Sequence, residues 1–109
     1  MNKDFKLSPD QLEQLVKDSV GCLASDKITV EGMPVGFMYR EEQDFPFDSG
    51  WRFLSGTEDK AYMNDPGNSG IYDVNTIANY DSAIIPYLDK PEGTELERVE
   101  GSDEFRELE

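Results

Sequence analysis

Carboxylates are the most abundant side chains in this sequence that could do chemistry. Aspartate and glutamate account for 24 of the 109 residues, histidine is absent, and the only cysteine is Cys22. Without histidine the chain cannot form a Ser–His–Asp or Cys–His catalytic arrangement, and one cysteine cannot hold zinc or an iron–sulfur cluster. Adjacent carboxylates such as Glu41–Glu42 and Asp103–Glu104 would point to opposite sides of a strand. We therefore expect no catalytic residue, no metal and no cofactor.

A calcium loop is the one metal site whose ligand types the sequence offers in a glycine-rich stretch, residues 64–73. An EF-hand loop needs side-chain ligands at positions one, three and five and a glutamate at position twelve. If Asp65 takes the first position, Gly67 falls at the third and Thr76 at the twelfth. Because turns prefer the same residue types, we interpret this stretch as a turn-rich loop.

Aromatic rings alternate with acidic side chains in the stretch of residues 44–51. Aromatic side chains supply the anchors of protein interfaces, and acids around them attract a cationic partner. Phe45 and Phe47, which flank a proline, are interface candidates or core residues, whereas Trp51 and Phe53 alternate as a strand does and are expected in the core. The candidate partner-binding residues are Glu42, Asp44, Phe45, Phe47 and Asp48, with Tyr80 and Asp81 as a second aromatic–acidic set.

The charge balance narrows the class of partner. Ten Lys and Arg residues against the 24 acids give a net charge of −14. Such a field repels nucleic acid and anionic lipid and attracts basic proteins. The same acidity also keeps a protein soluble without any partner, so both interpretations stay open. We expect no nucleic acid and no membrane partner.

Cysteine use and hydropathy indicate the compartment. A single cysteine allows no intramolecular disulfide, which secreted domains of this size often carry. Cys22 lies in a short apolar run and is expected to be buried and inert. Residues 1–7 are polar and unlike a signal peptide, and no stretch approaches the roughly 20 apolar residues of a membrane span. The expected compartment is the cytoplasm.

The clearest local signal is a helix start. Ser8 can cap a helix that begins at Pro9, and Gln11 completes a capping box. Four apolar residues then follow helical spacing, namely Leu12, Leu15, Val16 and Val20. This pattern predicts an amphipathic helix over residues 9–20 whose apolar stripe packs on a sheet.

Strand patterns fill most of the remaining chain. Alternation and β-branched residues predict strands at 28–30, 35–39, 51–55 and 71–74, and a closing pair formed by 94–99 and 105–108. A long connection over residues 41–50 joins two of these strands, and long connections are often functional. Short helices are expected within 58–63 and after Asp81. The predicted fold class is a single small α+β domain, with the N-terminal amphipathic helix packed on a mostly antiparallel sheet and one or two short additional helices.

Four segments in order carry a resemblance to a known family: residues 24–28, 35–41, 48–56 and 71–81. Over residues 22–97 the chain resembles the small bacterial domain DUF2185, also called the immunity protein Imm33 domain. The N-terminal helix (1–21) and an acidic strand or tail (98–109) flank this region within one structural domain. The resemblance implies a bacterial cytoplasmic protein that neutralises a toxin, and it assigns no toxin-contacting residue.

The resulting hypothesis is a non-enzymatic immunity-type protein that binds and neutralises a cognate toxin with a basic surface. The alternative is a cytoplasmic regulatory or small-ligand-binding module, which would need a pocket where carboxylates converge.

Overall fold

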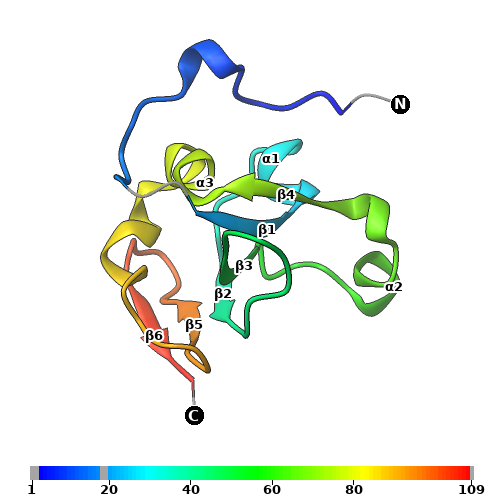
Figure 1. Ribbon diagram of the computed structural model, residues 1–109. Helices are drawn as coiled ribbons and strands as arrows, with labels where there is room; N and C mark the ends of the chain where they lie inside the picture. Colours follow the sequence, from blue (N-terminus) through cyan, green and yellow to red (C-terminus); the bar gives the residue numbers. More distant parts are fainter. Residues whose placement is uncertain (1–2, 18–19, 109) are drawn as a thin grey trace.

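The computed structural model describes residues 3–17 and 20–108, which form a mixed sheet of six strands with a few short helices (Figure 1). The strand order is β4-β1-β3-β2-β5-β6. Strands β1 and β3 pair in parallel, and the other neighbouring pairs are antiparallel. The strand bounds are β1 Gly21–Ser25, β2 Phe37–Arg40, β3 Asp48–Leu54, β4 Ser69–Asp73, β5 Glu95–Arg98 and β6 Phe105–Glu107.

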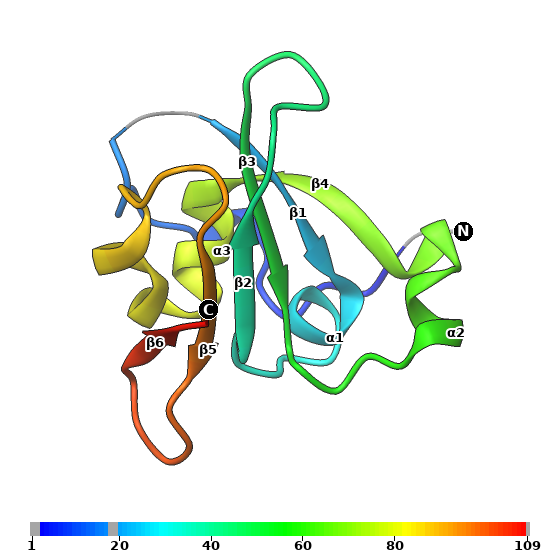
Figure 2. The ribbon, with the colours of Figure 1, turned by 90° about the horizontal axis from the view of Figure 1, so that it is seen from below.

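The longest helices lie on one face of the sheet. The α-helices are α1 Asp26–Thr29, α2 Lys60–Met63 and α3 Val74–Tyr80, and the 3-10 helices are η1 Pro9–Gln11, η2 Pro66–Asn68 and η3 Ser82–Tyr87. In Figure 2, β2 and β3 lie in front of α3, and α2 stands at the margin beyond β4. We call the face that α3 and η3 pack against the covered face, and the opposite one the open face.

Alternation along the strands sends one set of side chains into the core on the covered face. Trp51 and Phe53 of β3 are buried and stack at 6.1 Å between ring centroids, as the sequence predicted. Burying an aromatic side chain of this size stabilises the fold by about 2–3 kcal/mol. Cys22 of β1 is fully buried in the same core, and this burial raises the pKa of its thiol. The expectation that Cys22 is buried is therefore confirmed.

The predicted N-terminal amphipathic helix over residues 9–20 is wrong. Only one 3-10 turn, η1, forms at its start, where Gln11 Oε1 accepts the N–H of Ser8 (2.8 Å) as the capping box predicts. The chain then becomes extended, because two asparagines of α3 bond its backbone. Asn79 and Asn75 accept the N–H groups of Glu13 (2.9 Å) and Leu15 (2.7 Å). A helix would need those N–H groups internally; residues 18–19 lie outside the described part.

The predicted strand at residues 28–30 is also wrong, because this stretch belongs to helix α1 and the turn after it. The Ser25 hydroxyl accepts the N–H of Lys27 (3.1 Å) and caps the helix. Ile28 and Thr29 are both fully buried, so the β-branched side chains that suggested a strand instead pack into the core. Tertiary burial overrides the local preference here.

Several other elements agree with the sequence pattern, whereas β1 and α3 were not predicted. Strands β2, β3 and β4 lie where strands were expected at 35–39, 51–55 and 71–74, and β5 pairs with β6 as the predicted closing pair. Helices α2 and η3 lie within 58–63 and after Asp81, whose carboxylate caps η3 through the N–H of Ala83. A small α+β domain is confirmed, with a mixed sheet and without the long N-terminal helix.

Candidate functional site

The connection between β2 and β3 (residues 41–47) and the first three residues of β3 form a compact segment built around one buried carboxylate; we call residues 41–50 the 41–50 loop. Figure 2 shows it protruding beyond the ends of the strands. Asp48 Oδ2 accepts the N–H of Asp44 and Asp48 Oδ1 accepts the N–H of Gly50, both at 2.8 Å. Gly50 has φ +91°, and a Cβ there would lie 2.1 Å from the carbonyl oxygen of Glu41. Its close approach to Glu41 therefore requires glycine.

Arg52 completes this loop from the open face of β3. Its guanidinium bonds both oxygens of Asp48, at 3.0 and 2.8 Å, and donates from Nε to Glu41 at 2.5 Å. The side chains of Arg52 and Asp48 are 3% and 0% exposed. Burial alone would raise the pKa of Asp48, but the bonds from Arg52 and from the N–H groups of Asp44 and Gly50 lower it to about 2. Asp48 is therefore ionised at neutral pH.

The two phenylalanines of the loop have different roles. The Phe45 ring is half-buried and lies over the Arg52 guanidinium, 5.9 Å from ring centroid to Cζ. Phe47 is 79% exposed and has φ +64°, a left-handed conformation that costs a non-glycine residue about 1–2 kcal/mol. The N–H of Gly21 donates to the Phe47 carbonyl (2.6 Å), which fixes that conformation. The loop thus presents a large apolar ring to solvent on an ordered backbone.

A shallow hollow of ≈ 600 Å³ lies beside Phe47. Its lining includes Phe45, Phe47 and Ile71, the last from β4 and 62% exposed. An exposed phenylalanine and an exposed isoleucine beside one hollow form an apolar patch, and patches of this kind are often interaction sites. Glu42 and Asp44 are exposed on the same loop.

The second predicted set lies elsewhere. Asp81 Oδ2 accepts the N–H of Val35 (2.9 Å), just before β2, and pairs with Arg98 of β5. The Tyr80 hydroxyl accepts the N–H of Leu7 (3.1 Å). The 41–50 loop follows the other end of β2, so the structure brings together Glu42, Asp44, Phe45, Phe47 and Asp48 but not Tyr80 and Asp81.

Two residues of this surface were absent from the sequence prediction, Arg52 and Ile71. Arg52 lies between Trp51 and Phe53 in a strand, so alternation placed it on the face opposite the core without showing that the 41–50 loop covers it. Ile71 alternates with Tyr72, and alternation cannot tell which of two apolar neighbours faces solvent. An arginine inside an aromatic strand close to an acidic loop was the available signal.

The arrangement is suited to binding. Among residues 3–17 and 20–108, no group of three or more His, Cys, Asp or Glu side chains is placed to hold a metal ion. The acids of the loop either accept bonds within the protein, as Asp48 does, or lie exposed. Across the described ranges, no helix combines the length and apolar character that crossing a membrane requires.

These features define a class: a small acidic α+β domain whose most distinct surface feature is an ordered aromatic–acidic loop. The chain belongs to the immunity protein Imm33 domain family, whose model matches residues 22–109. The match begins in β1, runs through β6 and extends beyond residue 97, the end of the resemblance seen in the sequence. The family implies a role in toxin immunity, and immunity proteins are generally non-enzymatic. No curated protein and no solved structure is significantly similar to the chain.

Proposed function

We propose that this protein is an immunity protein that neutralises a cognate toxin by binding it through the 41–50 loop. The family supplies the toxin-immunity role. The observation that carries the choice of surface is Phe47, which is 79% exposed and held in a left-handed conformation within a hydrogen-bonded loop. Sparsely populated backbone conformations persist where the surroundings enforce them, and they concentrate at functional sites.

Each residue of the loop has a distinct part in this proposal. Phe47 is the anchor, and burying its ring against a partner would contribute about 2 kcal/mol. Phe45 forms the wall of the adjoining hollow. Glu42 and Asp44 are exposed and attract basic side chains of the partner. Asp48 is a positioning residue, because its carboxylate is occupied by Arg52 and by loop N–H groups.

Preorganisation supports tight binding. The loop backbone is already bonded to Asp48 and to Gly21 in the free protein. Binding then requires little additional ordering, and this ordering cost is a main term that weakens protein association. The net charge of −14 favours a basic toxin and rapid encounter. We place this action in the cytoplasm of the producing cell, in keeping with the family role.

The test is capture of the toxin from source cells by the tagged full chain, followed by affinity measurement with variants. Phe47→Ala is expected to raise the Kd by about 10- to 30-fold, because the anchor is lost. The double variant Glu42→Gln/Asp44→Asn is expected to slow association by about 3- to 10-fold at low salt and to leave dissociation nearly unchanged.

The matched control is Leu15→Ala, which removes another exposed apolar side chain, 42% exposed, from the N-terminal segment. It should leave the Kd within about 2-fold, since scattered exposed apolar residues carry little binding energy. Equal effects of Phe47→Ala and Leu15→Ala would contradict the loop assignment. Toxin that is never captured or suppressed under any salt condition would contradict the proposed function.

A further inference from the structure

The open face of the sheet carries a second surface, formed by side chains that lie in register across three neighbouring strands, β5, β2 and β3. Phe37 of β2 lies opposite Glu97 of β5 on one side and Leu54 of β3 on the other. Tyr39 of β2 lies opposite Glu95 in the same way. The Phe37 and Tyr39 rings are neighbours, 5.6 Å between centroids. Two aromatic rings therefore run along β2 with a glutamate beside each.

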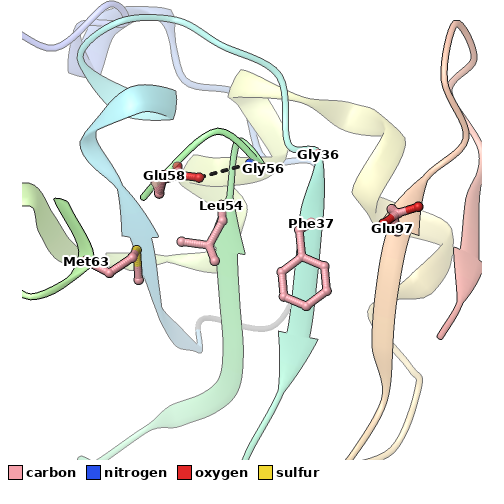
Figure 3. Close-up of a pocket in the computed structure, with 7 residues that line it drawn as sticks. All are labelled: Gly36, Phe37, Leu54, Gly56, Glu58, Met63 and Glu97. Carbon is pink, nitrogen blue, oxygen red and sulfur yellow. Dashed lines mark hydrogen bonds between the residues drawn. The ribbon is translucent and has the colours of Figure 1, made fainter. Parts of the chain in front are cut away.

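The Phe37 end of this face is hollowed. Figure 3 shows Phe37 and Leu54 between Glu58 on one side and Glu97 on the other, with Met63 of α2 at the margin. The hollow has a volume of ≈ 420 Å³. Glu58 Oε1 accepts the N–H of Gly56 at 2.9 Å, the dashed bond in Figure 3. Burial would raise the pKa of Glu58, but hydrogen bonds from Ser25 and from the turn lower it, so the carboxylate is ionised at neutral pH.

The Tyr39 end is bounded by acids as well. An adjoining hollow of ≈ 490 Å³ is lined by Tyr39 and by four glutamates, Glu41, Glu42, Glu92 and Glu95. Burial raises the pKa of the Tyr39 hydroxyl, and the negative charges of Glu41 and Glu95 raise it further. The negative potential that these side chains create is thus felt by the aromatic residue between them.

Cations near this face are occupied within the protein. Arg40 lines the second hollow, but its guanidinium donates to the carbonyls of Ser49 (2.8 Å) and Lys90 (2.7 Å). Arg52 is held by Asp48 and Glu41. Arg106 of β6 forms an exposed pair with Glu97 at 2.7 Å, with side chains 66% and 45% exposed. Exposed pairs of this kind are weak and exchange readily. The face therefore keeps an excess of negative charge beside the half-buried rings of Phe37 and Tyr39.

We infer that the open face between β2 and β5 binds an extended, arginine-bearing segment of a basic partner protein. Guanidinium groups stack on aromatic faces and pair with carboxylates in two-point geometry, whereas an ammonium group acts as a point charge. Alternate residues of an extended segment point to one side, so its arginines could reach the Phe37 and Tyr39 positions together. A second copy of this chain, with net charge −14, would meet like charge. The inference rests on the proposed function in one respect: it takes the segment to be part of the toxin.

The experiment uses the isotope-labelled full chain and a short capped peptide in which arginine alternates with alanine. NMR shifts are expected to cluster at Phe37, Tyr39, Leu54, Glu95 and Glu97. The arginine peptide should bind about 3- to 10-fold more tightly than the same peptide with lysine, because lysine lacks the planar group that stacks. Phe37→Leu, which keeps an apolar side chain but removes the ring, should reduce that preference to below about 2-fold.

Charge is tested with matched double variants. The double variant Glu95→Gln/Glu97→Gln should weaken binding of the arginine peptide by about 5-fold or more. Asp10→Asn/Glu13→Gln removes the same charge from the N-terminal segment, whose backbone is bonded to α3 on the covered face, and should change affinity by less than about 2-fold. Equal losses in both variants, or shifts spread over all acidic residues, would overturn the inference.

The two proposals fail separately. A protein that suppresses its toxin while the arginine peptide shows no preference for this face would overturn the docking inference and leave the proposed function standing. A protein whose open face binds the arginine peptide selectively, but which neither captures nor suppresses a toxin, would overturn the proposed function and support the docking surface.

Discussion

Two arginine–aspartate pairs secure the opposite ends of β2, and they support different surfaces. Arg52, which lies opposite Tyr39 of β2, pairs with Asp48 beyond the last residue of β2, and this pair holds the 41–50 loop, from which Phe47 projects into solvent. Asp81 and Arg98 lie beyond its first residues and tie the start of η3 to Val35 and β5. Both aspartates stand in aromatic–acidic stretches of similar composition. The two pairs differ in what they order: the Asp48–Arg52 pair holds a segment with an exposed ring, whereas the Asp81–Arg98 pair ties elements of the fold together.

The largest expected effect is a loss of stability when the buried Asp48–Arg52 pair is broken, compared with an exposed surface pair. Arg52→Met keeps the side-chain volume but leaves the Asp48 carboxylate buried without a counter-charge, which should lower the free energy of unfolding by about 3–5 kcal/mol. Arg106→Met removes an exposed pair with Glu97 and should change it by less than about 0.5 kcal/mol. Urea unfolding of both variants measures the contrast. A loss below about 1 kcal/mol for Arg52→Met would show that the loop is held by other contacts.

Acid should weaken the Asp48 end. The pKa of Asp48 is lowered from 3.8 to about 2 in the folded protein. A depressed folded pKa contributes stability that is present above the unfolded value and lost as pH falls towards the folded one, so about 2 kcal/mol disappears between pH 4 and pH 2. As the pH falls through that range, the free energy of unfolding should decrease more steeply for the wild type than for Asp48→Asn. Identical slopes would contradict the assignment, as would a carboxyl NMR titration of Asp48 near its ordinary pKa.

Substitution of Asp81 should lower the stability of the protein without changing its affinity for the toxin. Asp81→Asn weakens the bonds from Arg98 and Val35 and should lower the free energy of unfolding by about 1–2 kcal/mol. Toxin affinity, measured by titration calorimetry, should stay within about 2-fold of the wild type if the partner contacts only the 41–50 loop and the open face. A larger loss would extend the binding surface to Tyr80 and Asp81, as the sequence pattern suggested.

A small change in stability is also expected at Phe47, which has the highest exposed fraction among the large apolar residues that the structure describes. Phe47→Gly removes the cost of a left-handed φ while adding freedom to the unfolded chain, so the free energy of unfolding should stay constant or rise by up to about 1 kcal/mol. Phe47→Ala retains the left-handed cost and serves as the comparison. Thermal unfolding of both variants checks this prediction. A marked destabilisation by Phe47→Gly would mean that the ring stabilises the fold and is not free to serve as an anchor.

The site was partly visible in the sequence. Phe45 and Phe47 stood out because a proline and acids surround them, and the structure leaves Phe47 exposed. The role of Asp48 was not visible, because its partner Arg52 is recognised only once the loop folds back over β3. The open-face rows of Phe37 with Glu97 and Tyr39 with Glu95 also needed the strand register, which joins residues about 60 positions apart.

Some properties were determined by the sequence alone. The absence of histidine, the single cysteine and the net charge of −14 follow directly from composition. The strand at Trp51 and Phe53, the cap at Ser8 and the closing β5–β6 pair follow from short-range patterns, because alternation and capping act between near neighbours. Only the tertiary structure decided the rest. Asn75 and Asn79 bond the backbone of the N-terminal segment in place of a helix, since hydrogen bonds between distant residues can outweigh local preference.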